Sequence, residues 1–226
     1  MGTAIFWAGG WSFAAVLFAF FLPGIALSRL GAKRKAQLVD IDKRKARDAR
    51  QVFANGGAGA AAAIAFGITH SPVAAAAFAG AFATAAADTF GTELGTIFGG
   101  TPRSIAGFRA IARGLSGGVT AAGTLAEIAG AVLVAIVAAL LGIAAWWIVA
   151  VGGIAGAFAD SVTGATLQTL RYCSRCERFC EIDPHVCGTH APIVRGWRAI
   201  DNDAVNAIAT IAGALIAGGL VQLAAF

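Results

Sequence analysis

Charged residues are scarce in this chain. Lys, Arg, Asp and Glu together make up 13% of its 226 residues, whereas an ordinary soluble domain has roughly 25%. Hydrophobic residues make up 58% of the sequence, and its mean hydropathy is +0.76. This composition excludes an ordinary soluble fold and predicts a membrane protein, with little length left for a soluble domain.

The first apolar stretch has no positive charge ahead of it, because the first Lys or Arg is Arg29. A cleavable signal peptide has a positive segment before its apolar core and a small-residue cleavage site after it. We therefore expect a retained signal-anchor helix, followed by a basic cytoplasmic loop, in a first unit of residues 1–50. Residues 51–226 form the membrane domain expected to carry the activity, and they include a Cys-rich loop, 171–203.

Positive charge is also missing from the long apolar segments. All 17 Lys and Arg residues fall within residues 29–50, 103–113 and 171–198. Cytoplasmic loops carry the Lys and Arg excess, so we expect these stretches on the cytoplasmic side of the inner (cell) membrane. The net charge of +5 then reflects orientation, and no nucleic-acid partner is expected. The first basic loop, 33–50, either orients the first helix, which we favour, or binds anionic lipid headgroups.

The apolar segments between the charges predict the fold class: an all-α, polytopic transmembrane bundle of about six helices with a small cytoplasmic Cys/His loop. A transmembrane helix needs about 20 apolar residues, and small residues such as Gly and Ala let such helices approach closely. Turns at Thr69–Pro72 and Gly142 would lie outside, as would both termini. The predicted helices are about 4–28, 52–69, 72–88, 117–141, 144–170 and 204–225.

Four carboxylates lie in or beside these segments: Asp88, Glu93, Glu127 and Asp160. A charge at the bilayer centre costs about 2.5–3.5 kcal/mol on insertion scales, so such residues are functional candidates by default. The alternative is a packing hydrogen bond or a hydrated acid near the interface. For Glu127 we weigh the two interpretations equally.

Asp88 and Asp160 share a local sequence, in which a small-residue run ends in Ala-Asp followed by Thr or Ser. Their helices should run in the same direction, so both acids are expected in one site near the cytoplasmic face. Carboxylate and hydroxyl oxygens suit Mg²⁺. Glu93 would turn back to this site if Gly91 broke the helix.

A glycine- and hydroxyl-rich stretch, 113–120, precedes the fourth segment. It lacks the Gly-Lys-Ser/Thr of a Walker A loop. Glycines and a helix start nevertheless offer backbone N–H groups to an anion, although Gly also serves helix packing.

Before the last segment, Asn202 and Asn206 would share a helix face unless they only cap the helix. The candidate phosphate or nucleotide ligands are Arg103, Arg109, Arg113, Gly114, Ser116, Gly117, Gly118, Thr120, Asn202 and Asn206.

The four cysteines all lie within the 15 residues from Cys173 to Cys187. Cys173-x₂-Cys176 and Cys187-x₂-His190 have the spacing of two knuckles that together bind one structural Zn²⁺. Cytoplasmic thiols stay reduced, so disulfides are not expected. Cys180 and His185 are spare, and either is able to replace one ligand. Free thiols are the alternative, and an iron–sulfur cluster is a weaker one.

Four motifs, taken in their order along the chain, resemble those of a known protein family. Residues 87–95, 113–124, 160–168 and 202–206 resemble the integral-membrane family that includes plant phytyl-phosphate kinase and transmembrane protein 19. The resemblance covers about residues 50–225. More loosely, the order of acids and Ser-Gly-Gly is similar to two CTP-using membrane enzymes, dolichol kinase and phosphatidate cytidylyltransferase, which is a pattern-level analogy.

The resemblance implies a CTP-dependent, Mg²⁺-dependent kinase that converts a prenyl (phytyl or geranylgeranyl) monophosphate to the diphosphate. Asp88 and Asp160 would hold Mg²⁺ with help from Glu93, and Arg103 or Arg109 would hold the acceptor phosphate. The prenyl tail would lie in a groove between Ala- and Gly-rich helices. The partners are then the membrane and a lipid substrate, and a homodimer is considered. The alternatives are a lipid cytidylyltransferase, a prenol kinase or, from another class, a small-solute transporter.

Overall fold

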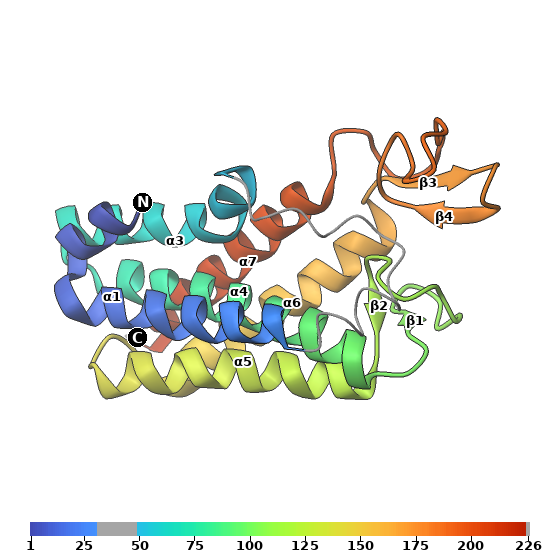
Figure 1. Cartoon of the computed structure of the whole chain (residues 1–226). Coiled ribbons are helices and arrows are strands. Elements are labelled where there is room, and N and C mark those ends of the chain that lie inside the picture. Colours follow the sequence, from blue (N-terminus) through green and yellow to red (C-terminus); the bar gives the residue numbers. More distant parts are fainter. Residues whose placement is uncertain (31–48, 225–226) are drawn as a thin grey trace.

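The computed structural model describes residues 1–30 and 49–224 of the chain. Within these residues, six helices are long and apolar enough to cross a membrane. This confirms the predicted all-α bundle. Its helices are α1 (Gly2–Arg29), α3 (Ala49–Thr69), α4 (Pro72–Phe98), α5 (Ala121–Leu140), α6 (Trp146–Thr166) and α7 (Asn202–Ala224). In this bundle, α6 and α7 run obliquely to α1, α3 and α5 (Figure 1).

Short antiparallel strands lie at one end of the bundle, called the polar end below (Figure 1). β1 (Arg103–Ser104) pairs with β2 (Gly118–Val119). A second sheet has the order β4-β3-β5, from β3 (Leu170–Cys173), β4 (Arg178–Cys180) and β5 (Ile193–Arg195). The two short helix–helix turns, predicted as external, lie at the opposite end, toward which both termini also lie.

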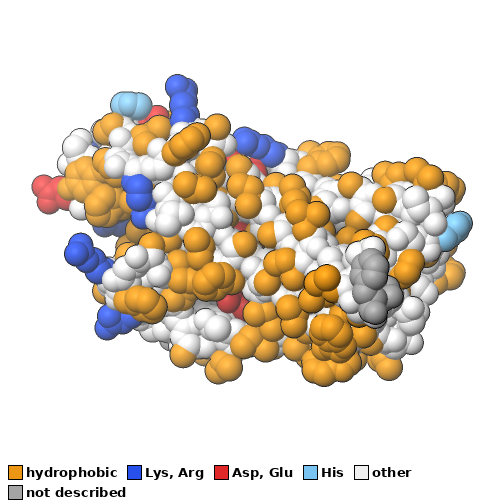
Figure 2. Space-filling model, turned by 180° about the vertical axis from the view of Figure 1, so that it is seen from behind, with side chains coloured by type: hydrophobic (Ala, Val, Ile, Leu, Met, Phe, Trp, Pro, Cys, Tyr) orange, Lys and Arg blue, Asp and Glu red, His pale blue; other side chains and the backbone are white. Residues whose placement is uncertain are grey.

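Charge is concentrated at the polar end. Figure 2 shows Lys and Arg side chains gathered toward this end and hydrophobic side chains over most of the remaining visible face. The described basic residues therefore share one side of the bundle, as the sequence predicted. The first basic loop, 33–50, lies outside the described residues except for Ala49 and Arg50, which begin α3.

α4 is the central helix, in contact with α1, α3, α5, α6 and α7. Its residues 78–87 are all buried. A Cβ added at Gly80 would overlap the Gly213 carbonyl of α7, and one added at Gly153 of α6 would overlap Ala83. Small residues thus bring the helix backbones together. At these crossings the small side chains are used for helix contacts.

One buried hydroxyl joins three helices. Thr84 of α4 is fully buried, and its Oγ1 donates to the Gly80 carbonyl at 3.0 Å. A Cβ at Gly156 of α6 or Gly213 of α7 would overlap this hydroxyl group. A polar atom inside the bundle is thereby satisfied by its own helix, while glycines on both neighbours leave room for it.

Three predicted helix boundaries near the polar end are wrong. α4 continues to Phe98 instead of ending near residue 88, because Gly91 is buried against α5 and stays helical. α5 begins at Ala121 rather than near 117, because Thr120 caps it by accepting the Gly123 N–H at 3.0 Å. α6 ends at Thr166 rather than near 170, because β3 begins at Leu170.

Candidate functional site

A pocket of about 1250 Å³ lies at the polar end. Its walls include residues from all six helices, the β1–β2 loop and the segment after α6. Among the lining residues are two arginines, Arg29 and Arg113. The acidic residues that line it are Asp88, Glu93, Glu127, Asp160, Glu181, Asp201 and Asp203. This excess of carboxylates in one pocket favours a bound divalent cation.

Asp88 and Asp160 lie at similar depths. Asp88 is 16 residues beyond Pro72, the start of α4, or about 24 Å along the helix axis. Asp160 is 14 residues beyond Trp146, the start of α6, or about 21 Å. Both helices start at the end opposite the strands (Figure 1), and the hydrocarbon core is about 30 Å thick. The two acids therefore line one pocket, at a depth near the polar boundary of the hydrocarbon core.

Glu93 and Glu127 extend the acidic wall. Glu93 lines the pocket although α4 does not break at Gly91, so the predicted break is not needed to bring it there. Gly91 is instead the contact point with Glu127 of α5, since an added Cβ would overlap the Glu127 side chain. Glu127 therefore packs one helical turn from Asp88, inside the same pocket.

The pocket carboxylates do not form a ready-made cage for a metal ion. A ready-made metal site would bring three or more acid, His or Cys ligand atoms within 4.8 Å of one another. Among the described residues, such a group is found in the Cys-rich segment and not in the pocket. Mg²⁺ commonly uses only one or two carboxylates and completes its shell with water and substrate phosphates. The pocket therefore fits a cation that binds together with a phosphorylated ligand.

The glycine- and hydroxyl-rich stretch lies on the pocket wall. Its predicted ligands there are Arg113, Gly114, Ser116, Gly117, Gly118 and Thr120. The β1–β2 pair closes the base of this loop. Gly117 has a φ of +76°, and a Cβ there would overlap the Ala165 backbone of α6. Only glycine allows this approach without strain, and it places the loop beside the helix that carries Asp160.

Two predicted phosphate ligands are not in the pocket. Arg103 is exposed, and its Nη1 donates to the Phe108 carbonyl at 2.8 Å within the β1–β2 loop. Arg109 is exposed in the same loop. The loop folds back on itself through the β1–β2 pair, and neither residue is among those that line the pocket. Arg29, at the end of α1, lines the pocket instead.

Glu181 was missed by sequence reasoning. Its carboxylate accepts the Ser116 backbone N–H at 2.6 Å and the Ser116 hydroxyl at 3.1 Å. It also accepts from Gln168 Nε2 at 3.0 Å. The sequence around Glu181 is rich in Cys and does not indicate this role. Its partner Gln168, however, is the last residue of the third motif, 160–168. The stretch thus binds a carboxylate with the donors expected to bind phosphate.

The entry to α7 combines a helix cap with pocket residues. Asp201 Oδ1 accepts the Ala204 N–H at 3.0 Å, so Asp201 performs the capping that was the alternative role for the asparagines. Asn202 and Asn206 both line the pocket. Arg50 of α3 pairs with Asp201 at 2.8 Å, which ties the start of α3 to this entry.

The four cysteines are free thiols. The Sγ atoms of Cys173, Cys176 and Cys187 and a ring nitrogen of His185 lie within 4.8 Å of one another. His185 thus takes the place predicted for His190. Cys180 is buried, and its Sγ donates to the Ile182 carbonyl at 3.7 Å.

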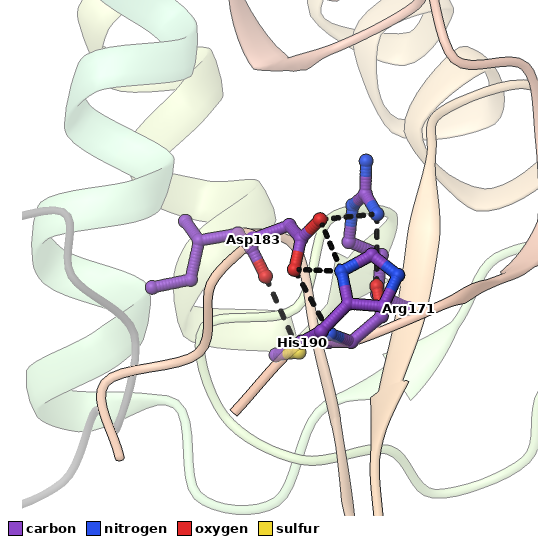
Figure 3. A network of polar contacts seen from close by, with 6 residues as sticks. Arg171, Asp183 and His190 are labelled. Carbon is purple, nitrogen blue, oxygen red and sulfur yellow. Dashed lines mark hydrogen bonds and ion pairs between the residues drawn. The ribbon is translucent and has the colours of Figure 1, made fainter. Parts of the chain in front are cut away.

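His190 has a different partner. Figure 3 shows Asp183 between His190 and Arg171. His190 Nδ1 lies 3.0 Å from Asp183 Oδ1, and the Ala191 N–H donates to the same oxygen at 2.9 Å. The Ala191 hydrogen bond, together with the nearby His190 and Arg171, lowers the pKa of Asp183 below its ordinary value. The imidazole of His190 is therefore directed to a carboxylate and not to the thiols.

Comparison with known proteins places the chain among membrane proteins. Protein PGR of Arabidopsis thaliana is 28% identical over 240 residues, which cover 92% of this chain and 81% of the relative. An uncharacterized membrane protein of Methanocaldococcus jannaschii is 34% identical over 173 residues, or 74% of this chain and 70% of the relative. An uncharacterized membrane protein of Synechocystis is 27% identical over 227 residues, covering 97% and 78%.

No solved structure matches the chain significantly. Residues 1–214 match the family described as Integral membrane protein DUF92. Together with the plant relative, this match confirms the integral-membrane family that the four sequence motifs predicted. The chain belongs to the DUF92 family of integral membrane proteins.

Proposed function

We propose that the chain is a membrane-embedded kinase that uses CTP and Mg²⁺ to convert a prenyl monophosphate to the diphosphate on the cytoplasmic side of the membrane. One observation carries this proposal: the four motifs, far apart in sequence, all line a single acidic pocket. The pocket exceeds the roughly 300–1,000 Å³ of a typical small-molecule site. It therefore has room for a nucleotide and a lipid phosphate together.

The reaction chemistry suits these residues. Phosphoryl transfer depends mainly on positioning and on neutralising charge. A monophosphate acceptor is already anionic near neutral pH, so the pocket needs no strong general base. Bound Mg²⁺ would supply the charge neutralisation, and Asp88 and Asp160 are the residues that would hold it, with Glu93 and Glu127 beside them.

The nucleotide phosphates would bind along the loop 113–120. Arg113 supplies positive charge, and the backbone N–H groups of Gly114, Gly117 and Gly118 are further donors on the pocket wall. The donors of Ser116 are bound to Glu181 in this structure. A phosphate at Ser116 would therefore require the Glu181 carboxylate to move.

The acceptor would bind against α1. Ile25 and Arg29 both line the pocket, and residues four apart share one helix face. An arginine one turn from an isoleucine matches a lipid with an anionic headgroup and an apolar chain. The neighbouring side chains of α1, Phe18, Phe21 and Leu22, are exposed on the bundle surface, where lipid would surround them. This assigns to Arg29 the acceptor role expected of Arg103 or Arg109.

The test is a turnover assay of the purified chain in detergent with Mg²⁺, geranylgeranyl phosphate and each of CTP, ATP, GTP and UTP. Geranylgeranyl diphosphate with release of CDP supports the proposal. Pyrophosphate release with a CDP-linked lipid would instead indicate a cytidylyltransferase, and turnover of free geranylgeraniol alone a prenol kinase. No product from folded protein would overturn the enzyme assignment and favour a transporter.

Paired variants then test the acids. We expect Asp88→Asn and Asp160→Asn each to abolish turnover, because each loses charge needed to hold Mg²⁺ in the pocket. Glu177→Gln is the matched control, since Glu177 is exposed in the β3–β4 turn and does not line the pocket. Full turnover by both aspartate variants would refute the assignment.

A further inference from the structure

Four side chains converge in the segment that follows α6. Cys173 ends β3, Cys176 lies in the β3–β4 turn, and His185 and Cys187 follow β4. Cys173 Sγ lies 3.6 Å from Cys187 Sγ, and His185 Nδ1 lies 3.2 Å from Cys187 Sγ. Ligand atoms around a tetrahedral Zn²⁺ are separated by about 3.8 Å, given Zn–S bonds of about 2.3 Å. The cluster is therefore close to the size of a zinc site.

This segment has little apolar interior of its own. Its core cluster consists of Cys173, Cys180 and Ala191, with Cys176 and Cys187 packed against them. Its larger apolar side chains are exposed instead: Phe179, Val186, Ile193 and Val194. Short strands without a hydrophobic core are not stable on their own, and small modules of this kind are held together by disulfides or metal ions. Because the thiols are free, a metal ion is the cross-link that remains.

His185 points to the same conclusion. It is 3% exposed, and its Nε2 is buried with no hydrogen-bond partner. Burying an imidazole without satisfying it costs free energy. Its other nitrogen, Nδ1, faces the thiols at 3.2 Å from Cys187 Sγ, so Nδ1 is the atom that would bind a metal ion, and Nε2 would carry the ring proton.

We propose that Cys173, Cys176, His185 and Cys187 bind one structural Zn²⁺. Three thiolates and one imidazole are soft and borderline donors that select Zn²⁺ over Mg²⁺. Four protein ligands leave no open position, so the ion would have a structural and not a catalytic role. His190 lies outside the site, because it is bonded to Asp183.

The site would also set the position of Glu181. That residue lies between β4 and His185, and its carboxylate holds the Ser116 loop in the acidic pocket. Zn²⁺ bound by Cys173 and Cys176 before β4 and by His185 after Glu181 would restrain the segment that carries this carboxylate. The metal proposal itself stands on the Cys/His geometry and does not depend on the proposed kinase reaction.

The experiment measures metal content of the full chain, purified in detergent without chelator, by inductively coupled plasma mass spectrometry. We expect about one zinc per chain. His185→Ala should lower the zinc content to background, whereas His190→Ala, the matched control, should retain it. Zinc is measured directly, so failure of this proposal and failure of the kinase proposal are distinguishable.

Two further measurements keep the result interpretable. His185→Cys should restore zinc as a four-cysteine site, even if His185→Ala fails to fold. Exchange into Co²⁺ should give the visible absorption of a tetrahedral thiolate site, and Cys180→Ser should not change it. The proposal would be overturned if the purified protein contained no metal, or if it contained iron in place of zinc. It would also be overturned if His190→Ala lost zinc and His185→Ala kept it.

Discussion

Glu181 occupies the hydrogen-bond donors that an incoming phosphate would need. Its two oxygens take both the N–H and the hydroxyl of Ser116, and Gln168 supports the arrangement. A carboxylate there shows that the loop accommodates an anion, and it also places a negative charge where the proposed nucleotide would bind. At the scale of single residues, Glu181 therefore competes with the proposed ligand.

The first prediction concerns that competition. Glu181→Ala should tighten binding of Mg²⁺–CTP by about tenfold, because a hydrogen bond to a charged group contributes about 1.5–3 kcal/mol and the freed donors become available to phosphate. Isothermal titration calorimetry in detergent measures the dissociation constant. Glu177→Ala, which changes an exposed acid outside the pocket, is the control. Weaker binding by Glu181→Ala would show that the carboxylate orders the loop instead of blocking it.

The second prediction separates the arginines. Arg29→Gln should raise the KM for the prenyl phosphate by about tenfold, because it loses a charge-assisted hydrogen bond to the headgroup, and should leave the KM for CTP unchanged. Arg109→Gln, an exposed residue outside the pocket, should change neither. Steady-state kinetics with each substrate varied in turn give both values. An equal effect of the two substitutions would remove Arg29 from the acceptor site.

Helix packing depends on glycine at the crossings of α4, α6 and α7. Gly213 lies directly over the Thr84 hydroxyl and the Gly80 carbonyl, whereas Gly219, less than two turns further along α7, faces open space. The chain therefore contains a pair of glycines in one helix with opposite surroundings. At the scale of the helix, Gly213 makes the close approach possible and Gly219 does not contribute to it.

The third prediction uses this pair. Gly213→Val should lower the free energy of unfolding by about 1–3 kcal/mol, as expected for overpacking, because the added side chain would overlap Thr84. Gly219→Val should have little effect. Thermal unfolding in detergent, followed by circular dichroism or by loss of monodisperse elution, compares the two. Equal stability of both variants would mean that α4 and α7 are not in this contact.

The molecule as a whole separates polar from apolar ends. All five strands lie at the polar end and the α3–α4 turn lies at the other (Figure 1), and Lys and Arg side chains gather toward the polar end (Figure 2). The Lys and Arg excess of cytoplasmic loops predicts that the polar end, with its acidic pocket, faces the cytoplasm. This orientation predicts which single positions a reagent added outside the cell is able to reach.

The fourth prediction tests that orientation in intact cells. His70→Cys should react with a membrane-impermeant maleimide added outside, because His70 is exposed in the turn between α3 and α4. Gly107→Cys, in the exposed β1–β2 loop, should react only after the cells are permeabilised. The unmodified chain, whose cysteines all lie at the polar end, controls for background labelling. The reverse pattern would invert the topology.

The sequence by itself determined the membrane class and the number of helices, and it predicts their direction across the membrane. These follow from the lengths of the apolar segments and from where Lys and Arg are missing, both of which are local properties of the chain. The Ala-Asp pattern also placed Asp88 and Asp160 together, because helices that cross the membrane in the same direction bring equivalent positions to equivalent depths.

Only the tertiary structure decided which side chains meet. Spacing favoured His190 as the fourth zinc ligand, but the fold bonds His190 to Asp183 and buries His185 among the thiols. Composition favoured Arg103 and Arg109 for phosphate, but in the fold both lie outside the pocket and α1 supplies Arg29. Contacts between distant segments depend on how helices and loops pack, and no local pattern specifies that packing.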